Sequence, residues 1–162
     1  MLVDFDILTD SSRVWVYAAE HKLTNTQQRC LIDLLSDHID GWHAHQLPLR
    51  GGVTIFEDHF IVIALDESQN AASGCAIDTL QNKIQQAEKK LKISLMNRMN
   101  IFCIINNIIE CISIDHLFDR DISKEILFYD LTIQRKGELK DWLKPIKDGW
   151  CNRFLSQDIA ID

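Results

Sequence analysis

Cys75 is the side chain in this sequence best suited to covalent chemistry. It follows Ser73 and Gly74 and opens an amphipathic stretch, so the pattern predicts a thiol in the first turn of a helix with Ser73 as its N-cap. Free N–H groups and the helix dipole stabilise a thiolate there. A base is also needed, and His45 or His59 would serve if the fold brings either within hydrogen-bond reach. The alternative is a small packed residue at a tight helix entry.

Acidic side chains flank this predicted helix start. Asp66 and Glu67 directly follow an apolar strand, where a carboxylate pair binds a cation, exchanges protons or caps the next turn. Asp78 is expected in the first turn of the helix, where an acid interacts favourably with the dipole. The backbone N–H groups at Ser73 and Gly74 favour an anion, so the stretch predicts a binding site for a small anionic ligand.

The sequence His43-Ala44-His45 would aim two imidazole rings to one side of a strand, as in metal sites. The same spacing occurs in rolling-circle and transposon nucleases, which also use a tyrosine on a helix. Here Tyr17 and Tyr129 both fall in predicted strands, and 24 acidic residues outnumber 17 basic ones. We therefore expect neither a metal centre nor a nucleic-acid partner.

Composition and length indicate one ordinary globular domain over residues 1–162. The chain is 46% hydrophobic and 25% charged, and its formal net charge is −7. Its N-terminus carries acids where an export signal needs basic residues, and polar residues interrupt the longest apolar run, at 101–114. Five cysteines form no C-x-x-C pair, which favours reduced thiols. We expect a cytoplasmic protein without a membrane segment.

The helices and strands that must position the candidate site can be predicted from the sequence as far as residue 114. A first helix is predicted from Thr24 or Thr26, with Gln27 completing a capping box, to about Gly41; His38 lies on its apolar stripe. The second helix begins after Ser73. The predicted strands are 13–19, 53–56, 60–65, 101–105 and 108–114, with the last four forming two hairpins.

Beyond residue 115 the pattern is weaker. It indicates a short helix or loop at 115–124, a strand at 126–133, a helix at 138–144 and a last helix from Ile146 to Leu155. The tryptophans of the helices are expected to be core or interface anchors, or the floor of a ligand pocket. They are Trp42, Trp142 and Trp150.

The order strand, helix, strand, strand, helix, strand predicts an α+β fold of the ferredoxin-like βαββαβ type, with extra C-terminal strands and a helix. Helices would cover one face of the sheet. Because few helices are available to cover the apolar strands, an exposed sheet face or edge is expected to make the protein a homo-oligomer.

Four motifs resemble those of a family of small bacterial proteins of about this length. They are an early R-V-W-x-Y strand, W-x-A-H near the end of the first helix, S-G-C-x-I-D after an acid-rich stretch, and a closing W-x-x-R-F-L. Here they read Arg13-Val14-Trp15-Val16-Tyr17, Trp42-His43-Ala44-His45, Ser73-Gly74-Cys75-Ala76-Ile77-Asp78 and Trp150-Cys151-Asn152-Arg153-Phe154-Leu155. The resemblance covers nearly the whole chain.

Members of that family are often labelled as ABC transporter ATPases. This sequence has no G-x-x-x-x-G-K-[ST] loop to hold nucleotide phosphates, so we do not expect ATP hydrolysis. The resemblance implies a common site for six residues and leaves His43 at a variable position. The six are His45, Ser73, Cys75, Asp78, Trp150 and Arg153.

Two functions follow from these observations. The first is a non-catalytic cytoplasmic domain that binds a small anionic ligand or a protein partner; its site would include Ser73, Gly74, Asp66, Asp78, Trp150 and Arg153. The second is a thiol-dependent enzyme in which Cys75 is the nucleophile and His45 the base, with Ser73 or Arg153 holding an anionic substrate. The sequence identifies no cofactor.

Overall fold

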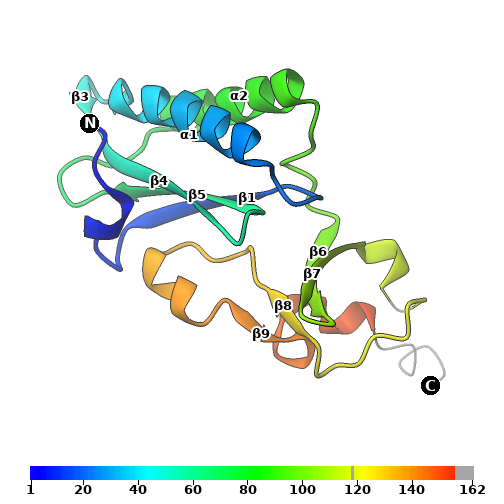
Figure 1. The fold of residues 1–162 in the computed structure, drawn as a ribbon. Coiled ribbons are helices and arrows are strands. Elements are labelled where there is room, and N and C mark those ends of the chain that lie inside the picture. Colours follow the sequence, from blue (N-terminus) through cyan, green and yellow to red (C-terminus); the bar gives the residue numbers. More distant parts are fainter. Residues whose placement is uncertain (118, 156–162) are drawn as a thin grey trace. The chain divides into compact units, whose positions relative to one another are not determined.

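A computed structural model describes residues 1–117 and 119–155 and divides the chain into two compact units (Figure 1). The first unit contains Met1–Met96 and Thr132–Glu138, and the second contains Asn97–Leu131 and the chain from Leu139 onward. The second unit is therefore built from two separate stretches of chain. The sequence has no linker-like composition where the chain passes from one unit to the other, after Met96, Leu131 and Glu138, so the division could not be predicted from it.

The first unit is a three-stranded antiparallel sheet with two helices on one face (Figure 1). The strand order is β1-β5-β4, and the sheet therefore has β5 at its centre. A two-stranded hairpin, β2-β3, follows α1. The elements are β1 (Arg13–Ala18), α1 (Asn25–Asp40), β2 (His43–Ala44), β3 (Leu47–Pro48), β4 (Arg50–Phe56), β5 (Phe60–Asp66) and α2 (Gly74–Leu91), preceded by a one-turn 3-10 helix at Phe5–Ile7.

Both long helices begin where the cap residues predict. Thr24 accepts a hydrogen bond from the N–H of Gln27, and the Gln27 side chain accepts one from the N–H of Thr24, which is a complete capping box. At α2, Ser73 Oγ accepts from the N–H of Ala76 over 3.1 Å. Helix α2 ends at Leu91, and its C-cap residue, Lys92, has a left-handed backbone with a φ of 55°.

The core of the first unit lies between the helices and the sheet. Strand residues with odd numbers point toward the helices, because successive side chains alternate between the two faces. Trp15, for example, pairs with Ile63, and Ile63 pairs with Val53. Apolar residues at helical spacing fill the other side of this core: Leu31, Leu35 and Ile39 from α1, and Leu80, Ile84 and Ala87 from α2.

A returning segment, Thr132–Glu138, completes the first unit along the edge strand β1. The N–H of Val14 donates to the carbonyl of Gln134, and the N–H of Lys136 donates to that of Ser12. The Lys136 ammonium donates to the carbonyls of Phe5 and Leu8, at 2.8 and 2.6 Å. The segment thus adds a short edge to the sheet and caps the 3-10 helix near the N-terminus.

The second unit is a four-stranded antiparallel sheet in the order β7-β6-β8-β9. Its strands are β6 (Asn100–Ile105), β7 (Ile108–Ser113), β8 (Leu127–Tyr129) and β9 (Leu143–Pro145). Its short 3-10 helices are Ile114–His116, Ile146–Asp148 and Trp150–Phe154. A further 3-10 helix, Lys136–Lys140, lies where the chain passes from the first unit to the second. The turn between β6 and β7 is made by Asn106 and Asn107, with φ values of 53° and 64°. The core contains Ile101, Cys103, Ile112, Phe128, Ile146 and Cys151.

The predicted elements before residue 114 are confirmed, and three predictions after it are wrong. The strand expected at 126–133 is only Leu127–Tyr129. The α-helix expected at 138–144 does not form. In its place, a 3-10 helix ends at Lys140 and strand β9 begins at Leu143. The last expected helix is two separate 3-10 helices with a break at Gly149.

The α+β class is confirmed, but the ferredoxin-like topology is not. Strands β1, β4 and β5 have the order that this topology requires of its first three strands. The strand expected as the fourth, β6, pairs instead with β7 and β8 in the sheet of the second unit. In the described part of the chain, no helix has the length and apolar character needed to cross a membrane.

Candidate functional site

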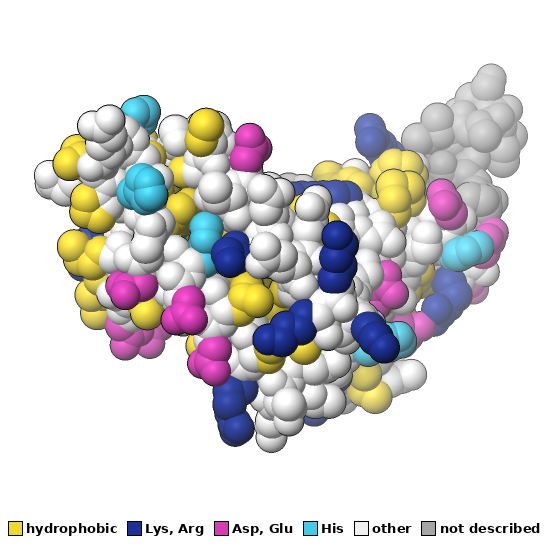
Figure 2. Space-filling view, turned by 90° about the horizontal axis from the view of Figure 1, so that it is seen from above, with side chains coloured by type: hydrophobic (Ala, Val, Ile, Leu, Met, Phe, Trp, Pro, Cys, Tyr) yellow, Lys and Arg dark blue, Asp and Glu magenta, His cyan; other side chains and the backbone are white. Residues whose placement is uncertain are grey.

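A pocket of about 420 Å³ lies in the first unit, where α1 ends and α2 begins. Figure 2 shows histidine and apolar side chains next to one another on the surface at this end of the helical layer. The residues that line the pocket come from both helices and from the start of β2. They are His38, Gly41, Trp42, His43, Cys75, Ala76, Thr79, Asn82 and Lys83.

Trp42 fixes the two sides of the pocket to each other. Its indole N–H donates to the carbonyl of Ala76 over 2.9 Å, which joins the end of α1 to the first turn of α2. The ring is almost completely buried and makes edge-on contacts with Trp15, with a centroid distance of 5.8 Å. The pocket therefore has a rigid base.

Cys75 is the second residue of α2, as predicted, and it is exposed in this pocket. Two histidines, His38 and His43, line the pocket with Cys75, whereas His45, the base expected from the sequence, does not. His45 lies in the turn of the β2-β3 hairpin with a φ of 54°, so the alternation expected for a strand stops at Ala44. The other proposed base, His59, is buried, and its Nδ1 atom bonds to the carbonyl of Ala19.

The environment of His43 fixes the tautomer of its ring. Nδ1 lies 3.0 Å from the carbonyl oxygen of Gly41, which can only accept a hydrogen bond, so Nδ1 carries the proton. The lone pair of a neutral ring is then on Nε2. His43 can therefore accept a proton or a hydrogen bond at Nε2.

His38 lies on α1 and packs against Trp42, with 5.5 Å between the ring centroids. Burial, and then the positive charge of Lys83, lower the pKa of this imidazole. The ring is therefore neutral at pH 7. The sequence placed His38 on the apolar stripe of the helix but gave it no functional role.

Acidification is expected to destabilise the first unit through His38. Its pKa is lower in the folded than in the unfolded chain, so below about pH 6.5 the unfolded state binds the proton first and the free energy of unfolding falls. Each unit of pKa difference corresponds to about 1.4 kcal/mol. Urea unfolding between pH 7.5 and 5 should show a shallower loss in His38→Gln than in wild type.

The exposed His21 provides the control for this comparison. His21→Gln should keep the wild-type dependence on pH. Equal slopes in wild type and His38→Gln would contradict the prediction.

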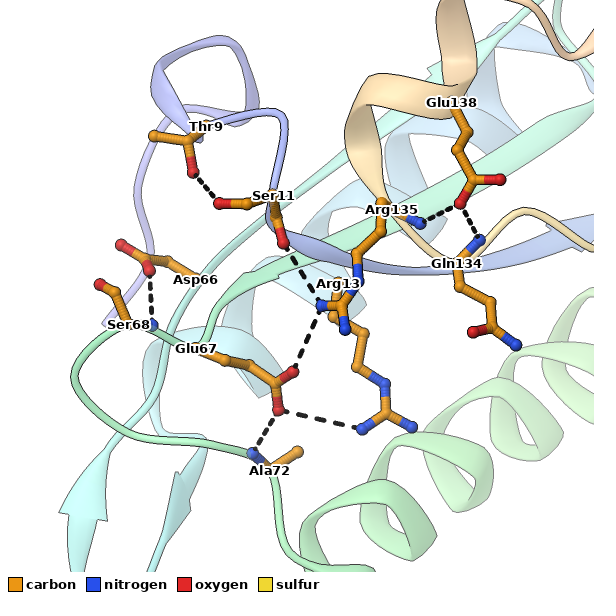
Figure 3. A network of polar contacts seen from close by, with 10 residues as sticks. All are labelled: Thr9, Ser11, Arg13, Asp66, Glu67, Ser68, Ala72, Gln134, Arg135 and Glu138. Atoms are coloured by element: carbon orange, nitrogen blue, oxygen red, sulfur yellow. Dashed lines mark hydrogen bonds and ion pairs between the residues drawn. The ribbon is translucent and has the colours of Figure 1, made fainter.

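Asp66 and Glu67 both have structural partners (Figure 3). Asp66 accepts hydrogen bonds from the N–H of Ser68 and from Arg50; bonds from Ser68, and then Arg50, lower the pKa of Asp66. Glu67 accepts from the N–H of Ala72 over 3.0 Å. These acids therefore fix the loop between β5 and α2, and the pocket is lined by neither of them.

Glu67 also lies between two arginines that come from distant parts of the sequence (Figure 3). Its carboxylate is 3.9 Å from Arg13 on β1 and 3.8 Å from Arg135 on the returning segment. The N–H groups of Gln134 and Arg135 in turn donate to Glu138. This network attaches the loop and the returning segment to the edge of the sheet.

The other predicted site residues are not gathered at the pocket. Ser73 has a structural role as the N-cap, and Gly74 and Asp78 are exposed on α2 outside the pocket lining. Asp78 is the fifth residue of the helix, one turn later than expected.

Trp150 and Arg153 belong to the second unit. Both contact Phe154: the Trp150 ring lies edge-on to it at 6.1 Å, and the Arg153 guanidinium lies over it at 4.8 Å. Within residues 1–117 and 119–155, no three His, Cys, Asp or Glu side chains are arranged to hold a metal ion.

The sequence analysis missed Lys83, although its spacing from Cys75 was visible in the sequence. Cys75, Thr79 and Lys83 follow one another at intervals of four residues, so they must share one face of α2.

The chain matches no known family model, no curated protein and no solved structure. The pocket is therefore interpreted from its own chemistry.

Proposed function

We propose that the protein is a binding domain that takes a small anionic ligand in the pocket between α1 and α2. The observation that carries this proposal is the lining of the pocket. A volume of about 420 Å³ falls within the range of small-molecule sites. Lys83 supplies a positive charge, and among the described residues no acid pairs with it. The start of α2 adds the favourable end of a helix dipole.

Removal of the Lys83 charge is expected to weaken anion binding about threefold to tenfold, since a charged hydrogen bond at a partly exposed site contributes about 1 kcal/mol. Benzoate is a suitable probe, because it combines a carboxylate with one ring. Chemical-shift titration of labelled protein would compare wild type with Lys83→Gln.

Lys89, which is exposed on the same helix but does not line the pocket, provides the matched control. Lys89→Gln should bind benzoate like wild type. Benzoate binding that is equally strong in both variants, or shifts that map outside the pocket, would refute the proposal.

The second candidate is the thiol-dependent enzyme with Cys75 as nucleophile. The geometry favours His43 over His45 as its base, because His43 lines the same pocket and has its lone pair on Nε2. In this mechanism Nε2 takes the proton of the thiol, and the thiolate forms a bond to an electrophilic carbon of the substrate. The leaving group departs from that carbon with the bonding electron pair and takes the proton back from Nε2.

Iodoacetamide at pH 7 tests this candidate, with peptide mass spectrometry reporting each thiol. His43→Asn should slow the alkylation of Cys75 roughly tenfold if the imidazole activates the thiol, and His45→Asn should not. Cys103 and Cys151 are internal controls: burial raises their pKa values to about 12 and about 11, so they should stay unlabelled in the folded chain. A Cys75 rate no faster than that of free cysteine would exclude the enzyme.

A homo-oligomer is the remaining part of the proposal. In the second unit β7 is an edge strand, and Ile108 at its start has 68% of its surface exposed. Leu127 and Leu143 on β8 and β9 are also exposed. Sedimentation of a monomer at high concentration would contradict association through these strands. The cytoplasmic location and the lack of nucleic-acid binding remain predictions from composition.

A further inference from the structure

The hydroxyl group of Thr79 lies next to the indole that forms the base of the pocket. Thr79 is an exposed residue of the pocket lining, on the face of α2 that also carries Cys75 and Lys83. Its Oγ atom donates to the carbonyl of Ala76 over 2.8 Å, and the indole N–H of Trp42 donates to the same carbonyl over 2.9 Å. The bond from Trp42 is buried, whereas the bond from Thr79 is only partly buried. The hydroxyl is therefore on the α1 side of α2 and within reach of a ligand.

Hydrogen bonds within the chain leave two fixed acceptors in the pocket. Because the hydroxyl proton of Thr79 is directed at Ala76, its oxygen presents only lone pairs to the pocket. His43 is also exposed, and its Nδ1–H donates to the carbonyl of Gly41, which leaves a lone pair on Nε2. A ligand that complements these two groups must bring a hydrogen-bond donor.

The charges around the pocket indicate which kind of donor fits. Lys83 and the first turn of α2 both supply positive charge, which disfavours an ammonium group on the ligand. A hydroxyl group would bring lone pairs of its own, which two fixed acceptors cannot satisfy. The N–H of an amide or an aromatic amine donates without that requirement and is uncharged at pH 7.

We propose that the ligand of this pocket is an acid that carries an uncharged N–H group: its carboxylate lies toward Lys83 and its N–H donates to Oγ of Thr79. This inference rests on the proposed function and specifies the class of ligand. Thr79 and Lys83 are four residues apart on α2, which is about 6 Å along the helix axis, so one small molecule can reach both. Thr79 thereby selects among acids of equal charge and similar shape.

The 3- and 4-aminobenzoates, each paired with the methylbenzoate of the same substitution, test the proposal. Amino and methyl groups are similar in size, and only the amino group is a donor. In chemical-shift titrations, at least one aminobenzoate should bind wild type about fivefold more tightly than its methyl counterpart, as one added hydrogen bond allows. Thr79→Val keeps the shape of the side chain and removes Oγ, so this preference should disappear. Thr79→Ser keeps the hydroxyl and should keep the preference.

The outcomes separate this inference from the proposed function. Benzoate binding that depends on Lys83, with no amino preference in wild type or with one that persists in Thr79→Val, would overturn the role of Thr79 alone. An amino preference that depends on Thr79, with equal binding by wild type and Lys83→Gln, would refute the anion site and leave the contact with Thr79 standing. Binding of none of these acids would overturn both. The spectrum of each free variant would confirm that it is folded.

Discussion

Replacing Trp42 with alanine is expected to lower the free energy of unfolding by about 3–5 kcal/mol, the usual cost of removing a large buried aromatic side chain. Trp42 is only 3% exposed, and its ring contacts both Trp15 and His38. The substitution also removes the hydrogen bond to Ala76 that joins the two helices. Urea unfolding followed by circular dichroism would measure the change.

A second substitution at the same position separates packing from hydrogen bonding. Trp42→Phe keeps an aromatic ring and loses the indole N–H, so its cost should be well below that of Trp42→Ala. The carbonyl of Ala76 keeps the bond from Thr79, which limits the effect further. A loss below about 1 kcal/mol for Trp42→Ala would show that this ring does not support the pocket.

Gly149→Ala is expected to destabilise the second unit by about 3 kcal/mol, at the upper end of the usual cost of overpacking. A Cβ atom at Gly149 would lie 2.1 Å from Cζ of Phe128, whose ring is buried in the core of that unit. The φ of Gly149 is −113°, which alanine adopts freely, so the cost comes from the clash alone. Thermal or urea unfolding of the variant would show it.

Two further variants test this explanation. Gly74→Ala adds a methyl group where nothing lies within 4 Å, so it should leave stability unchanged or slightly raised. Adding Phe128→Leu to Gly149→Ala should cost less than the sum of the two single changes, because the smaller side chain makes room. Additive losses would place the cause elsewhere.

The parts of the fold that were predictable are those whose stability is local. Thr24 and Gln27 form a cap within four residues, and Asn106-Asn107 forms a turn whose backbone conformation few other residues tolerate. The C-terminal third differs. Strands β8 and β9 have only three residues each. They form because they pair with each other across the chain between them, and the Lys144–Asp130 ion pair supports this pairing. Such contacts leave no periodic signal in the sequence.

The candidate site was predictable only at its centre. Cys75 and its helix start were found because a cap and an amphipathic pattern are local features. His43 was assigned a lesser role than His45, since the pattern does not reveal that a turn begins after Ala44. The spacing of Lys83 from Cys75 was available, but the packing of α1 against α2 that makes it relevant is a tertiary property.

The returning segment Thr132–Glu138 has a consequence for how the chain is made. The first unit obtains its last edge, including the contacts of Lys136, only from residues that follow most of the second unit in sequence. During translation its folding therefore cannot finish when Met96 leaves the ribosome, and β1 waits for some forty more residues to be synthesised, a delay of seconds at usual elongation rates. A gene truncated after Met96 would yield a sheet with an unprotected edge, prone to aggregate.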